Sequence, residues 1–135
     1  MALRVLIDTD VLSAILRRHS NALARARQYL TEHGQFSISI ITQYEILRGL
    51  KVKQATAQLD RFEELCRRSH VIPVSHDIVL KASDLYATLR RQGELIGDAD
   101  ILIAASALTQ ELGVATNNES HFRRIPGLHL ENWLT

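Results

Sequence analysis

The chain has 135 residues, of which 46% are hydrophobic and 23% are charged, and its formal net charge is +1. This length supports one hydrophobic core, and the ordinary globular composition argues against a disordered or fibrous protein. The single Cys66 excludes an internal disulfide or a zinc knuckle, so we expect a protein of the reducing cytoplasm.

The first half of the chain alternates between apolar runs and segments with helical spacing. Arg4, Asp8 and Asp10 interrupt the apolar N-terminus, so we expect no export signal. The expected elements are a buried strand over 3–7, a helix over 11–18, a helix over 20–32 capped by Ser20 or Asn21 and closed by Gly34, a strand over 36–40, a helix from Thr42 to about Gly49 and Leu50, and a polar helix over about 54–68.

The second half continues the alternation. No apolar run reaches the roughly 20 residues that span a bilayer, so we expect no membrane span. The expected elements are a strand over 70–74 that Pro73 places at a sheet edge, a helix capped by Asp77 that runs to Arg91 before Gly93, an apolar helix over 97–113, a strand over 114–116, a polar turn over 117–120 and a short last strand within 125–134.

Strands separated by helices predict right-handed crossovers and a mainly parallel sheet. We therefore expect a single domain over residues 1–135, with a three-layer α/β/α architecture and four to five strands. In such a sheet, ligands bind beyond the carboxyl ends of the strands.

Acidic and amide side chains recur near that expected edge. Asp8 ends the first strand, Glu45 lies in the first turn after the second strand, and Asn117 and Asn118 follow the fourth strand. Asp98 and Asp100 open the preceding helix, a placement that is less diagnostic because a helix after a long loop can begin at either edge. Four segments therefore offer oxygen ligands to one edge.

This set of residues indicates a divalent-cation site. Clustered carboxylates repel one another unless they bind a proton or a cation. Oxygen ligands without a Cys/His cluster favour Mg²⁺ or Mn²⁺ over zinc. Such an ion can acidify water and neutralise charge on a phosphate, so phosphodiester hydrolysis is the reaction that the pattern predicts.

Each acid also has a purely structural interpretation. Asp8 could cap the following helix, and Glu45 could complete a capping box that begins at Thr42. Asp98 and Asp100 could both serve the helix dipole, and because they are two residues apart they cannot share one helix face. Asp10 is more plausibly a residue that orients water or the backbone.

Basic residues form a second pattern. With Asp8, Asp10, Glu45, Asp98 and Asp100 set aside, sixteen basic residues remain against ten acidic ones, a balance that attracts a polyanion. The side chains that could contact RNA phosphates, or simply form a solvated face, are Arg17, Arg18, Arg48, Lys51 and Lys53. The six His residues are scattered, and Phe122 and Trp133 are expected in the core or at an interface rather than as platforms for base stacking.

Five segments in order resemble those of PIN-domain proteins, and specifically VapC-type toxins of toxin–antitoxin pairs. They are LIDTDVL, YEILRGL, GDADILIAASAL, VATNNESHF and RIPGLHLENW, which together cover nearly the whole chain. The resemblance implies an endoribonuclease that acts on structured cellular RNA, forms a homodimer, and is inhibited by a cognate antitoxin in its active-site groove.

The resemblance also implies roles for residues. It makes Asp8, Glu45 and Asp100 the catalytic, metal-binding acids and Asp98 an accessory metal ligand for Mg²⁺ or Mn²⁺. Supporting positions beside them are Thr9, Asp10, Thr116, Asn118 and His121. Many relatives carry another Asp where this chain has His121, which leaves Asn118, His121, Asp98 or water for the fourth corner. We expect three carboxylates around one firmly bound metal.

Two other functions compete with this hypothesis. Asp8-Thr9-Asp10 after an apolar strand could be the nucleophile and acid of a haloacid-dehalogenase-like phosphatase, although that interpretation leaves Glu45 unexplained. His121 in place of an acid could instead indicate an inactive PIN-like module that only binds RNA or protein.

Overall fold

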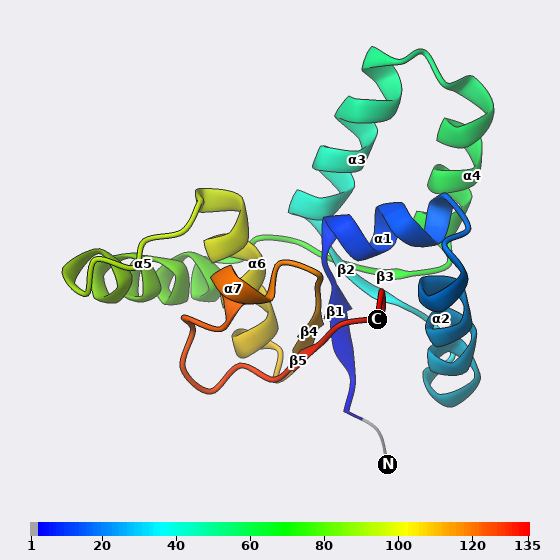
Figure 1. The fold of residues 1–135 in the computed structure, drawn as a ribbon. Helices are drawn as coiled ribbons and strands as arrows, with labels where there is room; N and C mark the ends of the chain where they lie inside the picture. The colour runs from blue at the N-terminus through cyan, green and yellow to red at the C-terminus, as the bar shows by residue number, and fades with distance from the viewer. Residues whose placement is uncertain (1–2) are drawn as a thin grey trace.

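The computed structural model describes residues 3–135 and has a three-layer α/β/α architecture (Figure 1). Over these residues, five strands form one sheet in the order β3-β2-β1-β4-β5, and every neighbouring pair is parallel. The strands are β1 (Val5–Ile7), β2 (Ser37–Ser39), β3 (His70–Ile72), β4 (Gly113–Ala115) and β5 (Leu130–Glu131). The expected fold class and the edge position of β3 beside Pro73 are confirmed.

The sheet separates two hydrophobic cores. Successive side chains of a strand point to opposite faces, so Val5 and Ile7 join one core while Leu6 joins the other. All three are fully buried, as expected of a central strand covered on both faces. Phe122 and Trp133 are buried in these cores, which is one of the two places expected for them.

Helices cover the two faces in two groups (Figure 1). One core packs beneath α1 (Thr9–Leu16), α2 (Ser20–His33), α3 (Ile40–Val52) and α4 (Thr56–Arg67). The other packs beneath α5 (His76–Arg91), α6 (Asp98–Thr109) and α7 (Glu119–Phe122). In Figure 1, α3 and α4 form a helical pair that extends beyond the sheet.

The start of α3 differs from the prediction. The Ser39 hydroxyl accepts a hydrogen bond from the N–H of Ile41 at 3.0 Å, so Ser39 caps the helix and the chain passes from β2 into α3 without a loop. The predicted start at Thr42 is therefore wrong. The predicted end near Gly49 is also wrong, because α3 continues to Val52 while Leu50 packs against the core.

Two other predicted caps are wrong. His19 caps α2 through its Nδ1, which accepts from a backbone N–H at 3.3 Å, and Ser20 and Asn21 are already helical. Ser75, not Asp77, caps α5. Gly34 does close α2, at φ 83°, where the absence of a Cβ removes the steric cost.

The end of α6 and the segment after β4 differ from the prediction. α6 ends at Thr109, four residues before the end of the predicted segment, and β4 begins at Gly113. The predicted polar turn over 117–120 already contains the first residues of α7. None of the helices over residues 3–135 combines the length and apolarity needed to cross a membrane.

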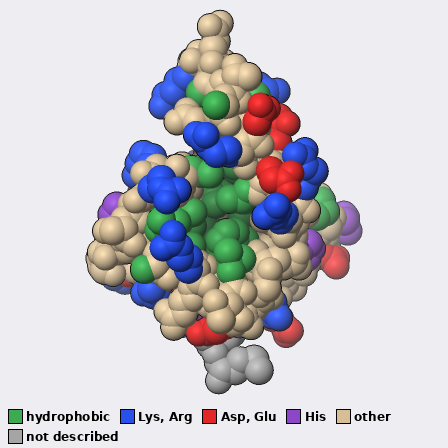
Figure 2. All heavy atoms as spheres, turned by 90° about the vertical axis from the view of Figure 1, so that its right-hand side faces the viewer, with side chains coloured by type: hydrophobic (Ala, Val, Ile, Leu, Met, Phe, Trp, Pro, Cys, Tyr) green, Lys and Arg blue, Asp and Glu red, His purple; other side chains and the backbone are tan. Residues whose placement is uncertain are grey.

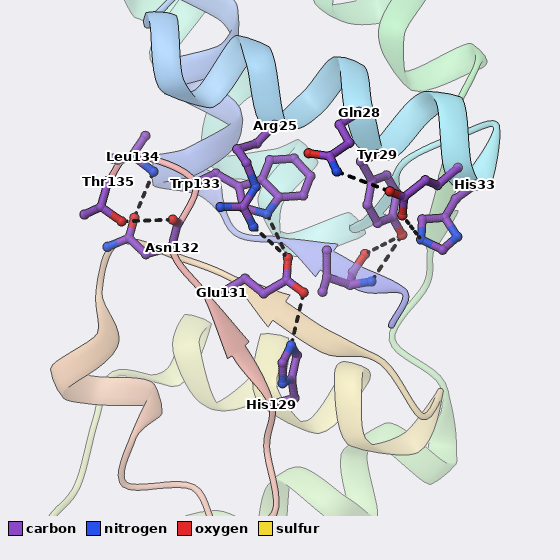
Figure 3. Close-up of polar contacts among 12 residues, drawn as sticks. Arg25, Gln28, Tyr29, His33, His129, Glu131, Asn132, Trp133, Leu134 and Thr135 are labelled. Carbon is purple, nitrogen blue, oxygen red and sulfur yellow. Dashed lines mark hydrogen bonds and ion pairs between the residues drawn. The ribbon is translucent and has the colours of Figure 1, made fainter. Parts of the chain in front are cut away.

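The C-terminal tail is tied to α2 through Glu131 (Figure 3). The Glu131 carboxylate accepts from Trp133 Nε1 at 3.0 Å, lies 3.1 Å from His129 Nε2, and is 3.4 Å from Arg25 of α2. On the same helix, the Tyr29 hydroxyl bonds both the N–H and the C=O of Val5. These contacts hold β5 and the start of β1 against α2.

Candidate active site

Asp8 lies at the point of the sheet where the strand order reverses. It follows β1, is only 5% exposed, and accepts hydrogen bonds from the N–H of Thr9 and from the hydroxyl of Thr116, each at 2.8 Å. Thr116 follows β4, the neighbour of β1. Asp8 therefore joins two strand ends at the position where α/β sheets bind ligands.

The surroundings of Asp8 disfavour its negative charge. Burial is the largest cause, and the neighbouring charge of Asp10 adds to it, so that the pKa of Asp8 rises to about 7. The hydrogen bonds from Thr116 and Thr9 lower this pKa, whereas the charge of Asp100 raises it further. An ionised Asp8 would gain stability from a cation.

Asp10 holds the backbone beside Asp8. Its two carboxylate oxygens accept from the N–H of Val11 at 2.7 Å and from the N–H of Asn117 at 3.1 Å. Burial raises its pKa, and so does the charge of Asp100. This contact fixes the segment after β4 against the start of α1.

Glu45 reaches the same edge from α3. Its Oε1 accepts from the Thr9 hydroxyl at 2.6 Å, and Thr9 Oγ1 lies 3.1 Å from the hydroxyl oxygen of Thr42. The capping-box interpretation of Glu45 is wrong, because Ser39 caps α3. Thr42 is fully buried and was interpreted from the sequence only as a cap; its place one turn before Glu45 was the available signal.

Asp100 lies among residues that follow β4. Its Oδ2 is 3.1 Å from His121 Nδ1 and 3.4 Å from Asn118 Nδ2, and the latter two nitrogens are 2.8 Å apart. The Asn118 N–H donates to Thr116 Oγ1, and the hydroxyl of Thr116 donates in turn to Asp8. Hydrogen bonds thus connect Asp8 with Asp100 through two residues.

Asp98 has a different environment from Asp100. It is exposed and lines a shallow groove between α5 and α6, together with Val79, Ser83 and Tyr86. Two residues along a helix turn a side chain to the far face, so the structure separates the two acids that the sequence had grouped. We do not assign Asp98 a place in the acidic site.

A groove beside Thr9 and Glu45 runs between α1, α3 and α4 and has a volume of about 300 Å³. Figure 2 shows an apolar hollow bordered by Lys and Arg side chains on this side of the molecule. The lining includes apolar Leu16, Ile46 and Leu50 and the basic residues Arg17, Lys53 and Arg61.

The basic residues predicted for RNA binding divide between the groove and other surfaces. Arg17 and Lys53 line the groove, as does Arg61, which the sequence analysis missed. Arg48 lies over the exposed Tyr44 ring, 5.1 Å from its centroid, and 3.9 Å from Glu45. Arg18 and Lys51 are exposed outside the groove lining.

The donor set at the edge fits a hydrated divalent cation. Asp8, Asp10 and Asp100 place mutually repelling charges near one another, and oxygen is the donor that Mg²⁺ and Mn²⁺ accept. Within residues 3–135, however, no three acidic, His or Cys side chains lie close enough to hold one ion. The expected three-carboxylate set therefore does not converge in this structure, and an ion would complete its coordination with water.

Comparison with known proteins agrees with the family resemblance of the sequence. The family model described as "PIN domain" matches residues 5–128. "Ribonuclease VapC2" of Rickettsia felis is 30% identical over 132 residues, covering 95% of this chain and 96% of the relative. The DNA-bound VapBC structure from Salmonella typhimurium contains a chain with 26% identity and a TM-score of 0.86, covering 98% of this chain and 99% of that one. A toxin–antitoxin complex from Klebsiella pneumoniae has 26% identity and a TM-score of 0.73, with 93% and 95% covered.

Proposed function

Because this chain belongs to the PIN-domain family, we propose that it is a metal-dependent endoribonuclease and the toxin of a toxin–antitoxin pair. The observation that carries the proposal is the meeting of three segments at one sheet edge. Asp8, Glu45 and Asp100 come from the end of β1, from α3 and from α6, and hydrogen bonds through Thr9, Thr116 and Asn118 relate them. The unit that carries this function is a single PIN domain over residues 1–135.

The residues around these acids would prepare the site for a phosphodiester. Asp8, Glu45 and Asp100 would attract Mg²⁺ or Mn²⁺ to this edge, where water would complete the ion's coordination. The ion would supply positive charge to a phosphate and make water more acidic. Thr9 orients Glu45, and Thr116 orients Asp8. Burial of Asp8 keeps bulk water from screening its charge.

The groove supports an antitoxin as the proposed inhibitor. Its apolar floor and basic border match a segment with apolar and acidic side chains, and its lining includes Thr9 and Glu45. A segment bound there would cover the approach to Glu45. The same basic residues, Arg17 and Lys53, would attract RNA phosphates when the groove is free.

A second copy of the chain is the proposed partner for the surface of α5. Val79, Leu80 and Tyr86 expose 46%, 52% and 37% of their area there, and an apolar surface of this kind can be covered by a partner protein. Sedimentation of the purified chain tests this part: a dimer supports it, and a monomer at micromolar concentration contradicts it.

Expression of the gene alone tests the function. We expect growth arrest in a bacterial host, with new RNA 5′ and 3′ ends mapped to discrete sites in cytoplasmic RNA. Expression of Asp8→Asn should produce neither effect. Wild-type protein that binds RNA without producing new ends would favour the inactive binding module, and phosphate retained on Asp8 after acid quenching would favour the phosphatase, which the family assignment already disfavours.

A further inference from the structure

Tyr44 is the aromatic residue that the fold leaves in solvent beside the acidic edge. The chain has one Trp, three Phe and three Tyr residues. Tyr44 and Tyr86 are the two that are not buried, and Tyr86 lies on α5, away from the groove. Tyr44 is 59% exposed, although it lies within α3. Its ring is therefore available to a ligand.

The ring lies directly beside a proposed catalytic acid. Tyr44 precedes Glu45, whose Oε1 accepts from the Thr9 hydroxyl at 2.6 Å. Consecutive side chains of a helix point about 100° apart, so Glu45 turns toward Thr9 while Tyr44 turns toward solvent. Their Cα atoms are only about 3.8 Å apart. A nucleotide whose phosphate lies at the acidic edge can therefore bring a base to the Tyr44 ring.

Arg48 connects the ring with this acid. Its guanidinium carbon lies 5.1 Å from the centroid of the Tyr44 ring, and its Nη2 lies 3.9 Å from Glu45 Oε2. Tyr44 and Arg48 are four residues apart in α3, so their side chains are neighbours on one face of the helix. A cation over an aromatic face is attracted to the ring and restrains it. Arg48 thus backs the ring, and the exposed remainder stays accessible.

An exposed ring backed by a guanidinium fits the flat face of a nucleotide base. Bases that leave their own stack pack against aromatic side chains and Arg guanidinium planes. Every base has such a face, so this contact requires no particular sequence. The basic residues Arg17 and Lys53 of the neighbouring groove would attract the phosphates of the same RNA.

We propose that Tyr44, backed by Arg48, is a stacking site for the base of a nucleotide next to the cleaved phosphate. The inference rests on the proposed endoribonuclease function and specifies how the site holds its RNA. The acids act on the phosphate, and the ring holds the neighbouring base in place. The energy of this stack fixes the position of the RNA relative to Glu45.

A purely structural interpretation is that the ring and the guanidinium only stabilise the surface of α3. Such a pair contributes modestly to a helix whether or not RNA is bound. The two interpretations differ in one observable: whether loss of the ring matters only when the RNA carries the base.

Binding of RNA to ring-altered variants measures the stack. All variants are made in the Asp8→Asn chain, which keeps the RNA intact, and the probe is a random-sequence pool of short single-stranded RNA. Tyr44→Leu keeps apolar bulk without a ring, and it should weaken binding by roughly 5- to 100-fold, the scale of one stacked base. Tyr44→Phe keeps the ring and should bind within about twofold of the parent chain.

Val52→Ala is the matched control. It removes exposed apolar surface from the last residue of the same helix and should bind as the parent chain does. Salt dependence then separates stacking from charge, because the slope of log affinity against log salt reports the phosphates that are neutralised. Tyr44→Leu should lower the affinity at every salt concentration and leave this slope unchanged. Circular dichroism confirms that each variant is folded.

Cleavage of one defined RNA by the otherwise wild-type chain gives the second readout. An abasic nucleotide is placed in turn on either side of the cleaved bond. At one of these positions, removal of the base should slow the wild type about as much as Tyr44→Leu slows cleavage of the intact RNA. On that abasic RNA, Tyr44→Leu should cause little further loss, because the base and the ring act as one pair.

The outcomes separate this inference from the proposed function. Equal losses in Tyr44→Leu on the intact RNA and on every abasic RNA would overturn the inference, because the ring would then act without the base. Unchanged RNA binding and cleavage in Tyr44→Leu would also overturn it and would favour a protein partner for the exposed ring. Both results leave the endoribonuclease standing. A wild type that cleaves no RNA in Mg²⁺ or Mn²⁺ would overturn the proposed function, while weaker RNA binding by Tyr44→Leu would still support the stacking site.

Discussion

Two carboxylates near the ends of the sheet have opposite environments. Glu131 in β5 faces donors and positive charge: although burial alone raises its pKa, hydrogen bonds from Trp133 and His129 and the charges of His129 and Arg25 bring it below its usual value (Figure 3). Asp8 after β1 is bound only by neutral donors and faces two other acids, so its pKa rises to about 7. The fold stabilises the charge of Glu131 and leaves that of Asp8 to an added cation. The comparison identifies Glu131 as a structural tether and Asp8 as a functional group.

The largest expected effect is on catalysis. Asp8→Asn should lower the rate of RNA cleavage by roughly 10² to 10³ or more, the scale at which one electrostatic stabiliser contributes to an enzyme. Glu131→Gln makes the same chemical change at the tether, and it should retain cleavage within about threefold. Single-turnover cleavage of one labelled RNA measures both, and equal losses in the two variants would remove the distinction.

The next effect is on stability without metal. Because folding raises the pKa of Asp8 from 3.8 to about 7, its protonated form favours the native state. This contribution to the free energy of unfolding is complete below pH 4 and is lost as pH rises through 7. The loss lowers the stability of the wild type by up to about 4 kcal/mol. Asp8→Asn should therefore be more stable than the wild type at pH 8 in EDTA, by about 1 to 3 kcal/mol.

Urea denaturation at pH 5 and pH 8 measures this difference. The stability advantage of Asp8→Asn should be smaller at pH 5. Addition of Mn²⁺ at pH 8 should restore the stability of the wild type. A variant less stable than the wild type at both pH values would show that Asp8 is a structural residue.

The tether gives the opposite pH dependence. Folding lowers the pKa of Glu131, so its contribution is present above the usual value of 4.5 and is lost as pH falls through the lowered native value. Glu131→Gln should cost about 1 to 2 kcal/mol at pH 7 and less in acid. Denaturation at pH 7 and pH 4 checks the trend, and a loss that grows in acid would contradict it.

The smallest effect concerns the surface partner of the tether. Arg25 is 41% exposed and 3.4 Å from Glu131, so Arg25→Gln should cost only about 0.2 to 1 kcal/mol. The cost should decrease in 1 M salt, because added ions screen an exposed pair. Thermal unfolding at low and high salt measures it, and a cost independent of salt would point to packing by the Arg25 stem instead.

Much of the fold could be predicted from the sequence, because the spacing of hydrophobic residues and the positions of turn residues are local signals of secondary structure. The apolar run before Asp8 predicts the central strand, and Gly34 marks a helix end. The residues at which helices begin were harder to predict. Ile40 continues the alternation of β2, so Thr42 was expected to open a helix that Ser39 in fact caps. Several hydroxyls could serve as the cap, and tertiary packing decides which one does.

The site could be predicted only in part for a related reason. Asp8 and Glu45 each follow a strand of a parallel sheet, and topology then places them at one edge. Asp98 and Asp100 precede their strand, and only the rotation of α6 determines which acid faces His121. The contact between Arg25 and Glu131 joins residues more than a hundred positions apart, and no local sequence pattern predicts it.

The most direct test of the metal-dependent acidic centre is cleavage of one defined RNA by the purified chain in Mn²⁺ and in EDTA, with Asp8→Asn beside the wild type. We expect cleavage only by the wild type and only in the presence of the metal. Equal cleavage in EDTA, or by Asp8→Asn, would contradict it.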